Sequence, residues 1–420
     1  MSSLGGREAT RAAIEAVARR SYGKLVAFLS ARTRDVAGAE DALSEAFASA
    51  LETWPQGGCP SNPEGWLLTA ARRKLIDSAR RQRSGANASV QLDILTERLE
   101  SAEAAAAHAE IPDRRLALMF ACAHPAIEPA IRAPLILQAL LGLDAAMIAS
   151  AFLMSPAAMA QRLVRAKQKI REAGIPFSVP TREDIPPRLG AVLDAIYAAF
   201  TRGWTAPGGT DLARRDLVEE AFFLGRLIVE LLPQESEALG LLALMQHAEA
   251  RRSARRNSQG DYVPLAEQDP DLWDAAMIDE AETLLIRARE QGAIGRFQLE
   301  GALQSAHAHR RRTGTANWEA VLELYDALLL LCPSPVVAVN RALAVAEVRG
   351  AQTALEELQS VAQDVRIGGY QPYWASRAEL LARTGARTEA RQAYEIAIGL
   401  EGDPAVRRFL QQRQSALPEG

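Results

Sequence analysis

The chain has 420 residues, more than one hydrophobic core usually supports, so two or three domains are expected. Its composition, 48% hydrophobic and 24% charged, is that of a globular protein and excludes a disordered or fibrous chain. The net charge of −4 is unevenly divided: residues 1–180 hold 22 Lys and Arg against 18 Asp and Glu, and the remainder holds 26 against 34. Basic residues clustered in one part of a chain are the footprint of a surface that contacts a polyanion.

Membrane insertion and secretion are not expected. The longest apolar run, residues 135–143, is about half the length that a bilayer requires, and the polar N-terminus lacks a signal-peptide hydrophobic segment. The three cysteines, Cys59, Cys122 and Cys332, are far apart and form no CxxC pair. This pattern is typical of a reduced protein and predicts a cytoplasmic location without membrane contact.

Apolar residues recur at three- and four-residue spacings almost throughout, which predicts an all-α fold. Two segments interrupt the pattern. Residues 84–112 are acidic and rich in small residues, and residues 176–187 contain four prolines, which disfavour helix. The chain is therefore expected to have three parts, residues 1–83, 113–175 and 188–415, joined by two linkers.

The third part contains a repeat. Ala320, Ala354 and Ala390 are 34 and 36 residues apart, and the positions four and seven residues after each are also apolar. Small residues at such spacing let paired helices pack closely, so residues 317–412 resemble a tetratricopeptide-like solenoid. A generic Ala-rich helical bundle is the alternative. Residues 188–316 are helical with poor repeat phase, and residues 251–270 are expected to form a loop insertion.

Residues 131–173 predict a helix-turn-helix. Asp144 can cap a short helix, Leu153-Met154-Ser155 can form the turn, and Ser155 and Pro156 are a natural start for the next helix. That helix has an apolar face, and its cations lie on another side. A basic helix that follows a three-residue turn fits the major groove of DNA. The inward positions are expected to be Met159, Leu163, Ala166 and Ile170, and the outward ones Ala158, Arg162, Arg165 and Lys169, with Gln161 beside them.

A second basic helix is expected after Trp66. Its apolar stripe is Leu68, Ala71, Leu75 and Ala79, and its cations fall on the opposite side. A loop rich in Gly and Pro, residues 54–63, is expected to precede it. A loop and an aromatic residue beside a basic helix could grip an unpaired base, because stacking and phosphate contacts hold single strands. The alternative is that Trp54 and Trp66 are core residues.

Three stretches in this order, AEDALSEAFASALETWP, NPEGWLLTAARRKLIDSARR and AQRLVRAKQKIREAGIP, resemble bacterial extracytoplasmic-function sigma factors. The resemblance covers essentially the whole chain and is to the subgroup with a long tetratricopeptide-like C-terminal domain. It implies sigma domain 2 at residues 1–83 and sigma domain 4 at residues 113–175. The acidic linker 84–112 would cross the polymerase surface, and a regulatory or interaction domain, residues 188–415, would follow the proline-rich linker 176–187.

The resemblance also implies partners and residue roles. The partners are core RNA polymerase, through its β′ clamp helices and β flap, and the −10 and −35 elements of promoter DNA. The implied polymerase-binding residues are Glu40, Asp41, Glu45 and Phe47. The implied −10 residues are Asn62, Trp66, Arg73, Lys74, Arg80 and Arg81. The implied −35 residues are Gln161, Arg162, Arg165 and Lys169, although Ala157 and Ala158 leave the start of that helix with few side chains that can read bases.

Other functions are less consistent with the sequence. An enzyme would need a phosphate loop, a nucleophile elbow or a metal cluster, and no GxxxxGK[ST], GxSxG or HExxH motif occurs. The pairs Cys122-x-His124 and His307-x-His309 lack a nearby third ligand, so neither a metal nor a cofactor is expected. A helix-turn-helix regulator with a solenoid sensor remains the alternative function. The −8 balance of residues 181–420 against +4 before them suggests that residues 188–415 control the sigma domains or bind a protein partner.

Overall fold

Helices α1 (Ser2–Thr33), α2 (Val36–Gly57) and α3 (Pro63–Gln82) form the N-terminal layer of the structure. The computed structural model describes residues 2–82, 111, 113–152, 154–205, 211–364 and 367–418. The predicted linker 84–112 therefore lies outside the described residues, except for Ile111. Helix α2 begins at Asp35, whose carboxylate accepts a hydrogen bond from the Gly38 amide, and it packs against both α1 and α3. Its buried side includes Ala39, Leu43 and Trp54.

A second group of helices packs directly onto this layer. It consists of α5 (Arg115–Cys122), α6 (Pro129–Leu141), α7 (Ala145–Ala151) and α8 (Pro156–Glu172), and α1 contacts both α5 and α6. The approach of α1 to α6 depends on Gly23, because a Cβ atom there would lie 2.3 Å from the carbonyl oxygen of Leu140. Gly142 ends α6 with a positive φ of 63°, which glycine adopts without strain.

The chain divides into two compact units, Met1–Ala199 and Phe200–Gly420. The first unit thus contains both predicted sigma domains and the first part of α9 (Pro186–Thr205), where Arg188 donates a hydrogen bond to the carbonyl of Phe120. In the predicted proline-rich linker, residues 182–184 form the short 3₁₀ helix η1 (Arg182–Asp184), and the last two residues, Pro186 and Pro187, already begin α9. The predicted domain boundaries stay a prediction.

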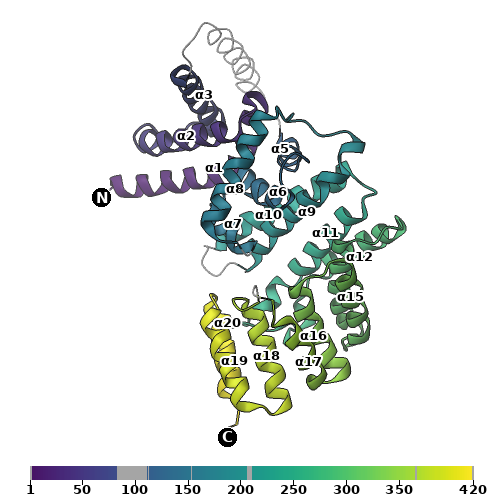
Figure 1. The fold of residues 1–420 in the computed structure, drawn as a ribbon. Helices are drawn as coiled ribbons and strands as arrows, with labels where there is room; N and C mark the ends of the chain where they lie inside the picture. Colours follow the sequence, from purple (N-terminus) through teal and green to yellow (C-terminus); the bar gives the residue numbers. More distant parts are fainter. Residues whose placement is uncertain are drawn as a thin grey trace. The chain divides into compact units, whose positions relative to one another are not determined.

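The second unit is a succession of helices in which neighbours along the chain pack together (Figure 1). Residues 252–272, which overlap the predicted insertion 251–270, form three short 3₁₀ helices, η2 (Arg252–Arg255), η3 (Leu265–Glu267) and η4 (Pro270–Leu272), and one isolated β-bridge between Arg256 and Tyr262. The helices are α10 (Asp211–Leu231), α11 (Ser236–Glu249), α12 (Ala275–Glu290), α13 (Arg296–Ala308), α14 (Arg310–Thr313), α15 (Trp318–Leu331), α16 (Pro335–Arg349), α17 (Ala351–Val361), α18 (Gln371–Thr384), α19 (Arg387–Leu400) and α20 (Pro404–Ser415).

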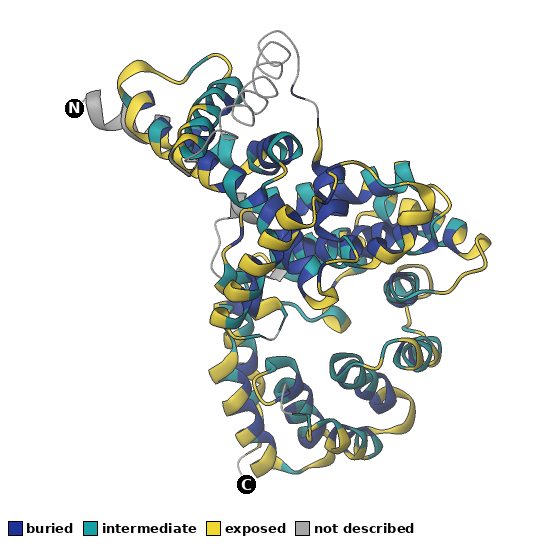
Figure 2. Ribbon diagram, turned by 45° about the horizontal axis from the view of Figure 1, so that its top comes forward, coloured by how far each residue is buried: buried dark blue, intermediate teal, exposed yellow. Residues whose placement is uncertain are grey.

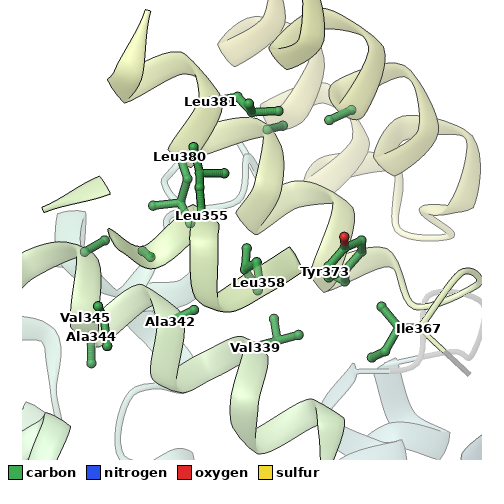
Figure 3. Packing of buried hydrophobic residues seen from close by; sticks show 14 of the residues in the cluster. Val339, Ala342, Ala344, Val345, Leu355, Leu358, Ile367, Tyr373, Leu380 and Leu381 are labelled. Atoms are coloured by element: carbon green, nitrogen blue, oxygen red, sulfur yellow. The ribbon is translucent and has the colours of Figure 1, made fainter. Parts of the chain in front are cut away.

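The small residues of the sequence repeat lie in the core of this unit in two of the three copies. Ala354 and Ala390 are fully buried, and Leu358 and Tyr394 beside them pack in the same hydrophobic cluster, part of which Figure 3 shows. In the first copy Ala320 is only half-buried, and Val321 is buried instead. Helix α15 contacts both α13 and α16, so its apolar residues are spread over two sides rather than one.

The described residues confirm the all-α fold, because none of them forms a β-strand. Buried residues follow one side of each of many helices, and exposed residues follow the other (Figure 2). This is the three- and four-residue periodicity that the sequence displays.

Candidate nucleic-acid interface

Helices α7 and α8 form the predicted helix-turn-helix. The carboxylate of Asp144 accepts a hydrogen bond from the Met147 amide (2.7 Å), and the Ser155 hydroxyl accepts one from the Ala158 amide (3.3 Å). Both predicted caps are therefore present, and Pro156 occupies the first position of α8. The turn is described except for Leu153. Helices α6 and α7 both pack against α8 and fix its orientation.

Helix α8 turns its predicted apolar face inward. Met159, Leu163, Ala166 and Ile170 are all buried. At 100° per residue, the direction opposite these four is that of Gln161, Val164, Arg165 and Gln168, all of which are exposed.

The predicted −35 residues are not equally placed on this helix. Gln161, Arg165 and Lys169 are exposed, and the Arg165 guanidinium donates a hydrogen bond to the side-chain oxygen of Gln161 (3.2 Å). Arg162 lies on the flank of α8 and is half-buried, with its guanidinium 3.5 Å from Glu128. Two exposed residues of the outward face, Val164 and Gln168, are missing from the sequence prediction. The sequence prediction chose the outward residues by grouping the cations of the helix. Choosing instead the residues on the side opposite the buried stripe identifies both Val164 and Gln168.

Helix α3 presents the other basic surface. The Asn62 side chain accepts a hydrogen bond from the Gly65 amide (2.9 Å), and the carbonyl of Asn62 accepts one from the Trp66 amide. Arg73 and Arg80 are exposed on the same helix, and Leu67, Leu68, Ala71 and Leu75 form its buried side. The side chain of Arg81 lies outside the described part of the structure.

The two tryptophans have different environments. Trp54 is 2% exposed and belongs to the core. Trp66 is half-buried and packs with its ring centroid 5.5 Å from that of Trp54 in an edge-to-face arrangement. An aromatic ring that packs at one side and meets solvent at the other can support a stacked base. The loop that precedes α3 includes the exposed residues Gly58 and Cys59.

The predicted polymerase-binding residues all lie on α2. Asp41 and Glu45 are exposed, Phe47 is half-buried, and Glu45 forms an ion pair with Lys74 of α3 (3.0 Å). A predicted polymerase contact and a predicted DNA contact are therefore neighbours.

Glu40 is placed differently. It is buried and forms an ion pair with Lys167 of α8, so a predicted polymerase contact lies against the predicted recognition helix. Burial raises the pKa of Glu40, and Lys167 opposes that rise. A second ion pair, between Arg171 and Asp35 (3.6 Å), joins the same two helices. The two helices that the sequence assigns to separate domains are thus held together by paired charges.

Other types of site have less support in the described part of the chain. No group of three or more His, Cys, Asp and Glu residues there could hold a metal ion. Taken one at a time, the described helices are too short or too polar to cross a membrane, and only the bent pair α7–α8 has the required length and composition.

Comparison with known proteins gives three matches. Residues 17–85, which include α2 and α3, match the family model of sigma-70 region 2. Residues 188–289 match a family of unknown function (DUF6596). The uncharacterized protein R00370 of Rhizobium meliloti (strain 1021) is 38% identical over 366 residues, which span 86% of each chain. No solved structure matches.

Proposed function

The chain belongs to the family of the Rhizobium meliloti protein and is a sigma-70 family factor that acts in promoter recognition. From this premise we propose which helices bind polymerase and which bind each promoter element. Region 2 would bind core RNA polymerase and the −10 element, and α8 would read the −35 element. The observation that carries this proposal is a region 2 match followed by a capped, basic helix-turn-helix in one compact unit.

The −10 element would meet α3 and the loop before it. Arg73 and Arg80 are exposed and can pair with phosphates, because each neutralised phosphate releases bound counterions and favours association. Trp66 and Asn62 lie at the start of the same helix, where an unpaired base could stack. Asp41, Glu45 and Phe47 on α2 would contact the β′ clamp helices of polymerase.

The −35 element would accept α8 in its major groove. The groove is wide enough for one helix, and the N-terminus of α8 carries a partial positive charge that favours a nearby phosphate. Arg165 and Lys169 supply further positive charge on the exposed side. Binding of this unit near the β flap would present the helix to the promoter.

The compact arrangement would have to open on the promoter. The two elements are centred about 25 base pairs apart, which is roughly 85 Å of duplex at 3.4 Å per base pair. Helix α8 is in direct contact with α2 through Glu40 and Lys167, and α2 packs against α3, so α3 and α8 cannot reach both elements while α8 stays on α2. Glu40 would become available to polymerase only after α8 has left it.

The C-terminal part would regulate the sigma domains. We propose that the protein belongs to the extracytoplasmic-function group, which its sequence resembles, and that its C-terminal part is a tetratricopeptide-like extension, which is supported by the buried small residues that recur on α17 and α19. The −8 charge balance of residues 181–420 complements the basic N-terminal part and would favour docking of the C-terminal part onto it or onto a protein partner. Such a factor would work in the cytoplasm, where polymerase is, and no catalytic step is part of the proposal.

Run-off transcription with purified core polymerase on the promoter of the protein's own operon tests the proposal. We expect initiation at a defined site that depends on both promoter elements. A protein that shifts duplex DNA unaided but does not bind polymerase would instead be the alternative, a helix-turn-helix regulator with a solenoid sensor. A factor that neither binds polymerase nor opens DNA would contradict both functions.

A truncation tests the regulatory role. The cut should fall within residues 206–210, because the first part of α9 belongs to the N-terminal unit, where the Pro187 carbonyl accepts a hydrogen bond from Arg132. We expect the truncated factor to initiate at a clearly different rate from the full chain. Equal rates on the same promoter would remove the regulatory role while leaving the sigma function intact.

A further inference from the structure

Helix α8 carries one large apolar side chain on its outward face. Val164 is 65% exposed, compared with 50% for Leu51 and 44% for Val179, the other large exposed hydrophobic residues of the first unit. It lies one helical turn from Gln161 on one side and from Gln168 on the other. The buried stripe of α8 faces the opposite way, so Val164 contributes nothing to the core.

The polar side chains around Val164 are already engaged within the helix. The side-chain oxygen of Gln161 accepts a hydrogen bond from Arg165 (3.2 Å), and the Gln168 amide donates one to Glu172 (2.7 Å). These bonds draw the long side chains along the helix surface. The branched methyl groups of Val164 are left facing outward between them.

The DNA major groove offers one apolar group, the C5-methyl of thymine. A valine side chain in the groove can cover that methyl and remove apolar surface from water, whereas it gains nothing comparable opposite the other three bases. An exposed valine elsewhere on a protein surface would carry no such meaning. Val164 lies on the face that α8 would turn to DNA, so its position on the helix determines at which base pair a thymine would be favoured.

We propose that Val164 is a specificity-determining residue that reads a thymine methyl in the −35 element. The inference rests on the proposed function, because it requires α8 to enter the groove. Arg165 and Lys169 would position the helix through phosphates or polar base edges, and Val164 would select thymine at one base pair. The contact is apolar, so its effect should change little with salt, unlike the phosphate contacts.

The test replaces each −35 thymine in turn, on either strand, by deoxyuridine, which lacks only the methyl group. Initiation by the full-length factor with core polymerase is then measured for the wild-type chain and for V164A. The matched control is V179A, the same change at another exposed valine of the first unit that lies outside α8. Both substitutions are at exposed positions, so the variants should fold.

We expect one thymine at which deoxyuridine lowers wild-type initiation about four-fold, which is the effect of about 0.8 kcal/mol for one buried methyl group. V179A should keep this sensitivity, and V164A should lose it. The proposal is overturned by a −35 element without such a thymine, by equal sensitivity in V164A, or by a loss of polymerase binding in V164A, which would place the residue against the flap. Absence of initiation by the wild-type chain on every template would instead count against the proposed function itself.

Discussion

Arg165 and Arg162 differ in their surroundings although they are neighbours on one helix. Arg165 is exposed and donates a hydrogen bond to Gln161 on the same helix. Its guanidinium can therefore turn to a guanine edge or a phosphate. Arg162 is half-buried on the flank and pairs with Glu128. The two arginines are equivalent in sequence, and their difference comes from which neighbours α8 packs against.

Replacement of Arg165 by Ala should therefore weaken −35-dependent initiation more than replacement of Arg162. We expect R165A to lose about 1–3 kcal/mol of discrimination between −35 sequences, and R162A to lose less than about 1 kcal/mol. Run-off transcription on promoter variants measures the difference. Core polymerase pull-down should be the same for both variants, and a weaker pull-down would show that these arginines have been misassigned.

Glu40 should make the stability of the first unit depend on pH. Its pKa in the folded protein is raised, chiefly by burial, so the folded state binds a proton that the unfolded state has released. Stability is then lost as the pH rises from the ordinary glutamate value through the raised pKa. E40Q removes this titration. The free energy of unfolding of wild type relative to E40Q should decrease as pH rises across that window, and a constant difference would contradict the assignment.

At the scale of elements, the crossing of α1 over α6 joins the N-terminal layer to the helix-turn-helix. Gly23 on α1 allows this approach, since a Cβ atom would lie 2.3 Å from backbone oxygen and could not be accommodated without moving a helix. Gly142 ends α6 against Tyr22, whose ring would lie 3.1 Å from a Cβ atom at that glycine. The sequence marks both positions only as isolated glycines.

G23A should destabilise the first unit by about 1–3 kcal/mol, as expected when atoms are forced into a packed contact. The matched control is G190A in α9, where a Cβ atom would have nothing within 4 Å. There, alanine should stabilise the helix by about 0.5–1 kcal/mol. Chemical denaturation of the two variants compares them directly, and a similar loss in both would show that the α1–α6 contact is not specifically close.

At the scale of the whole molecule, each compact unit has its own core and its own charge balance. In the first unit the Glu40–Lys167 ion pair holds the proposed −35 helix α8 against α2, the neighbour of the proposed −10 helix α3, although the two promoter elements are far apart. Two buried, paired charges are costly to separate unless each gains new partners or water. Polymerase and promoter DNA offer such partners to α2 and to α8.

A fluorescence-transfer pair can follow this opening. Labels at Ser44 of α2 and Glu172 of α8, both exposed, should give efficient transfer in the free protein once Cys59 and Cys332 have been replaced. Transfer should fall when core polymerase and promoter are added together. Initiation at an unchanged transfer efficiency would contradict opening of the first unit.

The sequence by itself determined the helical fold, both caps of the helix-turn-helix, the inward face of α8 and the small residues of the last two repeat copies. These follow from local propensity and from a periodicity that each segment carries alone. Only the tertiary structure decided that Glu40 lies against Lys167 and that Arg162 is half-buried beside Glu128. Such features depend on which surfaces of distant segments come together, and helical spacing describes one segment at a time.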